Sequence, residues 1–395
     1  MSQPPSSLSK ASVASDFQYP SESLSRGSFR FVRLLPKSKY GTLRLELRSN
    51  VPVGSRDFNY HALSYEWGQS EHRRTIMIND QIFVIRENLF LALEILHDQH
   101  VGVTDFGWFW VDAICINQNS IVDCEFQVQQ MKEVYKEASA VVAWLRPSRH
   151  RCDRDVFTIL EELGSNPKAC VERFGPSGSD DLFKTEERFE ALTSLCKRSY
   201  WQRMWIVQEI ILARNVRVLC GQHSTDLRNI LESVHLWYYY RDFAEIFTHF
   251  RPFRTLFLCF TSHRSIKPTG MPLLRLILYF GRQFCTLPHD KVYGLLGLTN
   301  NTQAIHVDYS VMLQILFFKI LESSNFDTTL EECYGLADAL HITIKITATS
   351  LRFLSQDIRA PPTVWTMPLP FLGSTIFLEV KREFNFRNTA AIIVQ

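Results

Sequence analysis

The run Gly107–Gln118, GWFWVDAICINQ, is the feature that most restricts what this chain can fold into. It is almost unbroken in apolar residues, carries one carboxylate, Asp112, and ends at the amide pair Asn117 and Gln118. A run that is apolar on both faces predicts a strand buried on both sides, as in a parallel sheet covered by helices. Ligands of α/β proteins bind at the carboxyl ends of such strands, so the polar residues there predict a site.

The chain after this run predicts a βαβ unit. Residues 127–138 place apolar side chains at helical spacing, and residues 140–145 are again apolar and strand-like. A strand, a helix and a strand over this length are typical of a crossover between parallel strands. We therefore predict that strands near 61–65, 108–115 and 140–145 are parallel neighbours in one sheet.

Other local patterns complete the expected elements. Asn79 and Asp80 tolerate positive φ and predict the turn of a hairpin. Asn88 is a candidate N-cap for a helix over 89–96, and residues 200–213 predict a further helix. The remaining strands are expected at 29–35, 42–47, 75–78, 81–85 and 216–220.

Composition divides the chain into four parts. They are a disordered Ser-rich tail at 1–28, a main domain at 29–220 with an insertion at about 146–197, a helical extension at 221–335, and a divergent C-terminal tail at 336–395. The first part has too little apolar content to offset the entropy of ordering. The insertion and the last part are marked by proline and glycine, which interrupt the regular patterns.

Charge and cysteine content exclude several classes of function. The chain has 43 basic and 41 acidic residues, a net charge of +2, which predicts no general attraction to nucleic acid or to acidic membranes. Its nine cysteines have no CxxC or zinc-type spacing, which favours a reducing, cytoplasmic environment and no metal site. No apolar run approaches the ~20 residues of a membrane helix. P-loop, dinucleotide, zinc-protease and nucleophile-elbow motifs are also absent from the sequence.

What remains are carboxylates beside aromatic residues. Ser64, Tyr65, Trp67 and Gly68 follow a short apolar run, and the glycine permits a turn or a close approach to a ligand. The aromatic rings at such a strand end are equally well explained as core. Asp112, inside an apolar run, is expected to pair with a cation or with backbone donors, or to take part in chemistry. Asn117 and Gln118 are expected to cap the next helix or to bind a polar ligand.

Trp205 and Glu209 are four residues apart, so on a helix they share one face. A glutamate against an indole loses hydration, which raises its pKa and suits it to acid–base chemistry or to holding a ribose hydroxyl. The alternative is an amphipathic helix with Trp205 inward and Glu209 paired at the surface with Arg203 or Arg214.

Four ordered blocks resemble the heterokaryon-incompatibility (HET) domain of filamentous fungi. Over roughly residues 28–310, they are YHALSYEWG at 60–68, the βαβ unit from Gly107 to Leu145, YWQRMWIVQE at 200–209, and DKVYGLLGL at 290–298 followed by DYS at 308–310. The resemblance implies fungal self/non-self recognition and programmed cell death, signalled through protein interaction. It implies partners among other proteins of the incompatibility pathway, with homo-oligomerisation as an option, and no bound cofactor.

HET domains have been regarded as distant relatives of TIR domains, and two places in this chain are similar to them. Leu63–Tyr65 resembles the first-strand motif, and Trp205 with Glu209 resembles the helix that carries the catalytic glutamate in TIR enzymes. This implies a flavodoxin-like parallel core with an appended helical region and, as an alternative function, an NAD(P)-consuming glycohydrolase. Glu209 would then be catalytic, and the ligand-binding candidates would be Ser64, Tyr65, Trp67, Gly68, Asp112, Asn117, Gln118 and Trp205.

The chain departs from these patterns at three positions. Cys124 follows Asp123 where HET domains typically have arginine, and His289 stands where they usually have arginine before Asp-Lys. Ile206 stands where TIR enzymes usually have cysteine. The first two departures remove cations that are candidates to pair with Asp112 or Glu209.

Overall fold

The computed structural model of the 395-residue chain describes most of the region between residues 16 and 342. The described ranges are 16–20, 24–54, 58–99, 107–148, 153–165, 186–240, 269–300, 305–324 and 329–342, together with the short strands β10 (Trp365–Pro368), β11 (Thr375–Leu378), β12 (Val380–Lys381) and β13 (Ala391–Ile392).

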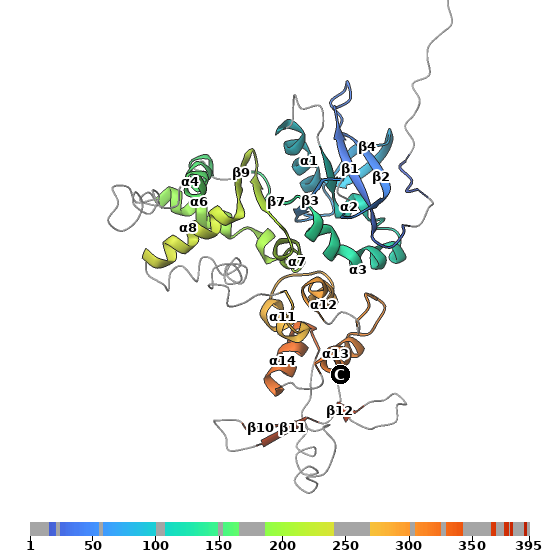
Figure 1. Cartoon of the computed structure of the whole chain (residues 1–395), viewed down its shortest axis with the longest axis vertical. Helices are drawn as coiled ribbons and strands as arrows, with labels where there is room; N and C mark the ends of the chain where they lie inside the picture. The colour runs from blue at the N-terminus through green and yellow to red at the C-terminus, as the bar shows by residue number, and fades with distance from the viewer. Residues whose placement is uncertain are drawn as a thin grey trace, which may run out of the picture.

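The described residues form a nine-stranded sheet in the order β5-β4-β2-β1-β6-β3-β7-β8-β9, drawn in blue to yellow in Figure 1. Its strands are β1 (Ser28–Leu35), β2 (Arg44–Pro52), β3 (Tyr60–Tyr65), β4 (Arg73–Ile78), β5 (Gln81–Arg86), β6 (Trp108–Trp110), β7 (Ala140–Trp144), β8 (Val216–Cys220) and β9 (His223–Asp226). The strands expected at 29–35, 42–47 and 216–220 are therefore present, whereas β9 had no clear sequence pattern.

Strand β3 lies between β6 and β7 and is parallel to both, which confirms the predicted parallel neighbours. Strand β8 continues the parallel set beside β7. The sheet as a whole is mixed, because β1 is antiparallel to β2 and β6, and the hairpins β4–β5 and β8–β9 are antiparallel. The fold is therefore a mixed α/β fold in which β6, β3, β7 and β8 form one parallel block and β2 is also parallel to β4.

The predicted strand at 108–115 is too long. Strand β6 ends at Trp110, and α2 (Asp112–Cys115) is a single helical turn in which Cys115 N donates to Val111 O at 2.7 Å. The buried side chains of Ile114 and Cys115 make this turn as apolar as a strand, so the sequence carries no signal for the change. Asp112 thus opens a helical turn at the end of a strand and does not lie inside one.

The helices surround and extend this sheet. They are α1 (Glu87–Gln99), α3 (Ile121–Glu137), α4 (Asp153–Ser165), α6 (Glu186–Cys196), η1 (Ser199–Gln202), α7 (Ile206–Ile211), α8 (Leu227–Tyr240), α11 (Leu273–Phe280), α12 (Asp290–Tyr293), η2 (Leu296–Leu298), α13 (Leu313–Ser323) and α14 (Leu330–Ala339).

Local expectations for turns and caps had mixed outcomes. Asn79 and Asp80 have φ of 50° and 62°, as the predicted hairpin turn requires. The cap at Asn88 was wrong: α1 begins at Glu87, and the Asn88 amide accepts from Trp144 Nε1 at 3.0 Å. The single helix at 200–213 was also wrong, because Arg203 is extended and bridges to Phe284, which separates η1 from α7.

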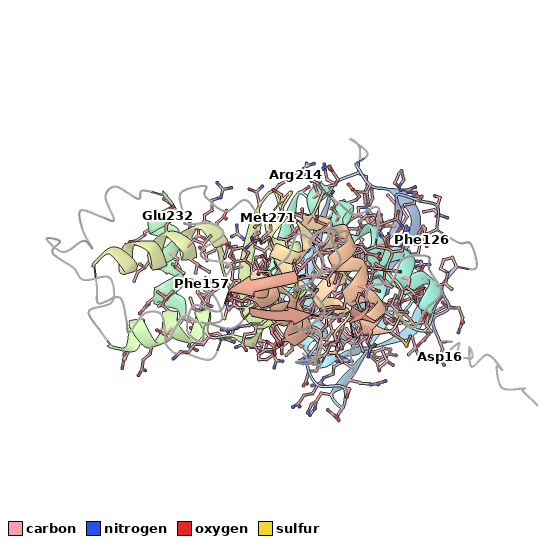
Figure 2. The ribbon with its side chains drawn as sticks, turned by 90° about the horizontal axis from the view of Figure 1, so that it is seen from below. Asp16, Phe126, Phe157, Arg214, Glu232 and Met271 are labelled. Carbon is pink, nitrogen blue, oxygen red and sulfur yellow. The ribbon has the colours of Figure 1, made fainter. Side chains whose placement is uncertain are left out.

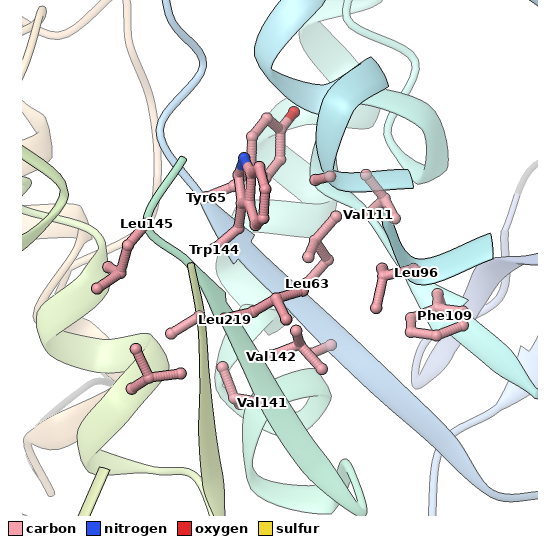
Figure 3. Close-up of a cluster of buried hydrophobic side chains, with 14 of the residues drawn as sticks. Leu63, Tyr65, Leu96, Phe109, Val111, Val141, Val142, Trp144, Leu145 and Leu219 are labelled. Carbon is pink, nitrogen blue, oxygen red and sulfur yellow. The ribbon is translucent and has the colours of Figure 1, made fainter. Parts of the chain in front are cut away.

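Two hydrophobic clusters form the core, and α7 belongs to both. The larger includes the sheet and contains Ile206 and Ile210, while the smaller joins α11, α13 and α14 and contains Met204 and Val207. Figure 3 shows part of the larger cluster, where Tyr65 and Trp144 lie side by side on neighbouring strands. In Figure 1, α7 lies between the sheet and the lower helices. This short helix therefore fixes the helical extension to the sheet.

The described helices of the stretch expected to be an insertion, α4 and α6, pack against the rest of the domain, while residues 149–152 and 166–185 lie outside the described ranges. Helix α4 contacts α6, α8 and β9, and its buried Phe157 and Leu160 belong to the larger cluster. Figure 2 shows the helices that carry Phe157 and Glu232 on the side of the protein opposite to Phe126.

The tail expected at residues 1–28 is ordered at its end. Asp16 pairs with Ile82, the Phe17 ring packs on Phe83, and the Tyr19 hydroxyl donates to Ile114 O at 2.9 Å. These aromatic contacts explain why residues 16–20 depart from the predicted disorder, while residues 1–15 lie outside the described residues. Within the ranges that the structure describes, no helix is long and apolar enough to cross a membrane.

A buried ion pair fixes the start of α3. Arg30, which is 5% exposed, donates to Asp123 at 2.8 Å and to Cys115 O at 3.0 Å. Asp123 also accepts from Asn117 N at 2.7 Å, and its own N–H donates to the cap Ser120. The pair therefore connects strand β1, the loop after α2 and the first turn of α3.

We predict that Asp123→Ala lowers the free energy of unfolding by about 3 kcal/mol or more, because it leaves the buried Arg30 without its counter-charge. Urea denaturation measures this change. Glu46→Ala is the matched control, since the Glu46–Arg33 pair at 2.5 Å is about one-third exposed and such pairs contribute at most about 1 kcal/mol. Equal losses in both variants would contradict the prediction.

Candidate functional site

The carboxyl end of β3 meets α7 at a buried carboxylate. Ser64, on β3, donates to Glu209 Oε2, and its Oγ also lies 2.6 Å from the Tyr200 hydroxyl on η1. Glu209 is 3% exposed, and Ser64 and Tyr200 are also buried. These three buried polar groups therefore satisfy one another by hydrogen bonding. The structure therefore excludes the alternative in which Glu209 lies at the surface. Arg214, one of the surface partners considered for Glu209, pairs with Glu137.

Arg203 supplies the positive charge at this edge. Its guanidinium donates to Tyr65 O and interacts electrostatically with both Glu209 and Asp112. Burial alone would lower the pKa of Arg203, but the two carboxylates raise it above its usual value. Arg203 therefore remains charged and holds the two acidic groups near the end of β3.

Asp112 lies on the other side of Arg203, at the start of α2. Its Oδ2 accepts from Trp67 Nε1 and its Oδ1 from Ala113 N, both at 2.7 Å. Burial raises the pKa of Asp112, while Trp67, Arg203 and the Ala113 N–H oppose the rise. The expectation that Asp112 pairs with backbone donors or a cation is thus met. We call Ser64, Asp112, Tyr200, Arg203 and Glu209 the carboxylate cluster.

Glu209 has the chemistry of a proton-transfer group. Burial raises its pKa to about 7, against the opposing effects of Arg203 and the Ser64 hydroxyl. A carboxyl that titrates near neutral pH can both hold and release a proton under physiological conditions. The Ser64 hydroxyl donates to this carboxyl and is itself hydrogen-bonded to the Tyr200 hydroxyl.

Three of the predicted site residues lie elsewhere. The Trp205 indole hydrogen-bonds to Asp290 and lies near Gly294, where an added Cβ would be 3.6 Å from its ring, so it does not turn toward Ser64 with Glu209. Asn117 and Gln118 lie beyond α2, and Gln118 donates to Asp112 O at 3.0 Å. Neither caps α3, because Ser120 does.

The loop after β3 turns back toward β7. Gly68 has φ of +74°, and a Cβ there would lie 3.3 Å from Asn88, so the close approach needs glycine. Glu66 accepts from Arg146 Nε at 3.1 Å and from Ser199 Oγ at 2.7 Å. Glu66 and Tyr200 stand in the blocks YHALSYEWG and YWQRMWIVQE, but neither they nor Arg146 were predicted as site residues, because their partners are far away along the chain.

A polar pocket of about 550 Å³ opens where β3 and β7 end. Its lining residues are Glu66, Leu145, Arg146, Glu190, Thr193, Ser194, Lys197, Arg198, Ser199 and Tyr200. Tyr200 belongs both to this pocket and to the carboxylate cluster, whereas Glu209 and Asp112 do not line it. The described residues contain no group of three His, Cys, Asp or Glu side chains placed to hold a metal ion.

These observations define an α/β domain with a polar site at the carboxyl ends of adjacent parallel strands. The sequence profile of the heterokaryon incompatibility protein (HET) family matches residues 60–209, which begin at β3 and end at Glu209. The chain therefore contains a HET domain.

A relative whose name also refers to heterokaryon incompatibility supports the assignment of a HET domain. Heterokaryon incompatibility protein 6, OR allele, of Neurospora crassa is 25% identical over 353 residues, which cover 74% of this chain and 51% of that protein. The chain is thus its distant homologue and spans about half of its length. No solved structure matches the chain significantly.

Glu209 should make stability depend on pH. Its pKa is higher in the folded protein, about 7 against 4.5, so the folded state keeps a proton that the unfolded chain loses. The resulting stabilisation is complete below pH 4.5 and is lost as pH rises to about 7. We predict that the wild type loses on the order of 2 kcal/mol more than Glu209→Gln between pH 5 and pH 8.

Denaturation of both proteins at the two pH values measures this difference. Glu133→Gln, a change at an exposed position of α3, is the control and should follow the wild type. Parallel pH profiles for the wild type and Glu209→Gln would show that Glu209 is ionised in the folded protein at both values.

Proposed function

We propose that this protein acts in fungal self/non-self recognition and cell-death signalling, as a heterokaryon-incompatibility module that works through protein interaction. The observation that carries the proposal is the HET match over residues 60–209. The ends of that segment meet in the structure, since Ser64 of β3 donates to Glu209 of α7. The first strand and the last helix of the matched segment are thus joined by a buried hydrogen bond. Other proteins of the incompatibility pathway, or further copies of the chain, would be its partners in the cytoplasm.

The core also supports the finer proposal of a flavodoxin-like, TIR-like domain. The four parallel strands occur along the chain as β3, β6, β7, β8 and lie in the sheet as β6-β3-β7-β8. This spatial order, 2-1-3-4, begins the flavodoxin-like order, whose ligand lies where the order reverses. The reversal here is between β3 and β7, and the 550 Å³ pocket lies at their carboxyl ends.

A second candidate function, cleavage of the glycosidic bond of NAD(P), is favoured by Glu209. The raised pKa suits a general acid or base, and Ser64 and Tyr200 connect its carboxyl to the pocket wall. Glu209 does not itself line the pocket, so direct contact with a substrate would need a movement of Tyr200. This favours the interaction module as the first proposal.

Expression of the chain in a filamentous fungus should arrest growth and cause cell death, measured by colony diameter and by uptake of a vital dye. If interaction is sufficient, Glu209→Gln retains at least half of the effect, because the amide still fits the contacts with Ser64. Asp123→Ala, which breaks the Arg30 pair, should weaken the effect because it lowers the stability of the fold. Normal growth with confirmed accumulation of the wild-type protein would contradict the proposal.

For the second candidate, purified protein is incubated with NAD and nicotinamide release is followed by chromatography. If Glu209 transfers the proton, Glu209→Gln lowers the rate at least 100-fold, the usual contribution of such a group. Glu133→Gln should leave the rate unchanged. An equal rate in the wild type and Glu209→Gln would contradict the role of Glu209 in proton transfer, and no release by the wild type would contradict cleavage itself. Both outcomes leave the recognition proposal intact.

A further inference from the structure

We propose that the pocket between β3, β7 and α6 binds a phosphorylated sugar, of the kind found in nucleotides and sugar phosphates. This goes beyond the recognition function, because it concerns a small ligand of the domain and holds whether or not the ligand is cleaved. The inference depends on the charges, the backbone conformation and the hydroxyl groups of the pocket.

The first argument is the charge of Arg198, which no carboxylate of the described residues neutralises. This residue is 8% exposed, and its NH1 donates to Leu145 O at 3.0 Å and Pro147 O at 3.1 Å. Its NH2 contacts Cys220 Sγ at 3.5 Å. None of the carboxylates in the described ranges forms an ion pair with Arg198. A buried cation whose partners are carbonyls and a thiol is stabilised by a nearby anion, and the pocket is where an anion can approach.

The second argument is the backbone of Arg146. It has φ of 75°, a left-handed conformation that is uncommon for a side chain of this size. The conformation turns the chain sharply after β7 and directs the guanidinium to Glu66, 3.1 Å away, at the end of β3. Glycine would adopt this backbone without strain, so the arginine side chain is retained at an energetic cost. Such strain is typical of a residue held for binding.

The third argument is the mixture of groups on the wall. Arg146, Lys197 and Arg198 outnumber the two carboxylates of Glu66 and Glu190, which leaves an excess of positive charge. Phosphate oxygens are recognised by such cations and by hydroxyls, and Thr193, Ser194 and Ser199 are hydroxyl-bearing residues of the wall. Carboxylates in the same pocket accept from the hydroxyls of a sugar. Leu145 and the Tyr200 ring supply an apolar part of the wall, against which the carbon skeleton of a sugar can pack.

Helix α6 supplies the part of the wall that faces the sheet. Glu190, Thr193 and Ser194 belong to it, and Lys197 follows its last residue. The part of the chain that the sequence marked as an insertion thus contributes specificity. The volume of about 550 Å³ is within the usual range of small-molecule sites and suits a sugar phosphate or one nucleotide. A bound ligand would contact Tyr200, the residue that joins the pocket to Ser64 and Glu209.

Isothermal titration of the full chain tests the proposal, with ribose 5-phosphate, ADP, ribose and inorganic phosphate as separate probes. We expect ribose 5-phosphate and ADP to bind at least tenfold more tightly than ribose and than phosphate alone. Lys197→Glu and Ser194→Trp, which reverse a charge and fill the pocket, should weaken binding at least tenfold. Lys136→Glu, at an exposed position of α3, is the matched control and should not change it.

The variant Arg146→Gly distinguishes an effect on ligand binding from an effect on stability. Because glycine adopts φ of 75° without strain, the melting temperature of this variant should be equal to or above that of the wild type. Its binding of ribose 5-phosphate should be at least tenfold weaker. A lower melting temperature with unchanged binding would show that Arg146 is purely structural and overturn the proposal. Failure of every phosphorylated probe to bind at millimolar concentration, or binding unaffected by Ser194→Trp, would also overturn it. These outcomes are independent of the cell-death and NAD assays.

Discussion

The hydrogen bond from Ser64 to Glu209 is the interaction on which the rest of this structure depends, because it fixes α7 against the end of β3. A buried carboxyl is expensive to desolvate unless it is protonated, paired or hydrogen-bonded, and here Arg203 and Ser64 serve that purpose. The neighbouring residue, Gln208, accepts from Gly297 N at 2.8 Å on the other side of the helix. Successive residues of α7 thus attach the sheet and the helical extension to each other.

This attachment also gives the site its organisation. Arg203 is extended and lies outside the helix, so its guanidinium reaches Tyr65 O and the region between Glu209 and Asp112. Tyr200, in the preceding turn, separates Glu209 from the pocket while remaining hydrogen-bonded to Ser64. The proposed ligand and the titrating carboxyl therefore lie on opposite sides of one tyrosine. In this arrangement a ligand could influence the joint between the two hydrophobic clusters without touching Glu209.

The departures from the HET pattern are compensated by other residues. Asp123 has Cys124 after it instead of arginine, but Arg30 of β1 supplies the cation from across the sheet. The arginine that usually precedes Asp290 is His289, which interacts with Val311 O, while Lys291 donates to the carbonyls of Gly281 and Gln283. The cation beside Asp112 and Glu209 is Arg203, which comes from the YWQRMWIVQE block itself. The carboxylates of this region are therefore neutralised by cations from other elements, Arg30 of β1 and Arg203 before α7.

By itself the sequence determined the elements whose patterns are local. The parallel strands β3, β6 and β7, the Asn79–Asp80 turn and the assignment of Ser64 and Glu209 to one candidate site followed from apolar runs, φ preferences and motif resemblance. Only the tertiary structure decided the end of β6, the break before α7, the direction of Trp205 and the pocket. In each case the deciding contacts join residues distant in sequence, such as Arg203 with Phe284 and Glu66 with Arg146. Local patterns cannot encode those pairings, because the sequence around each residue does not identify its partner. The two residues of a pair come together only when the chain folds.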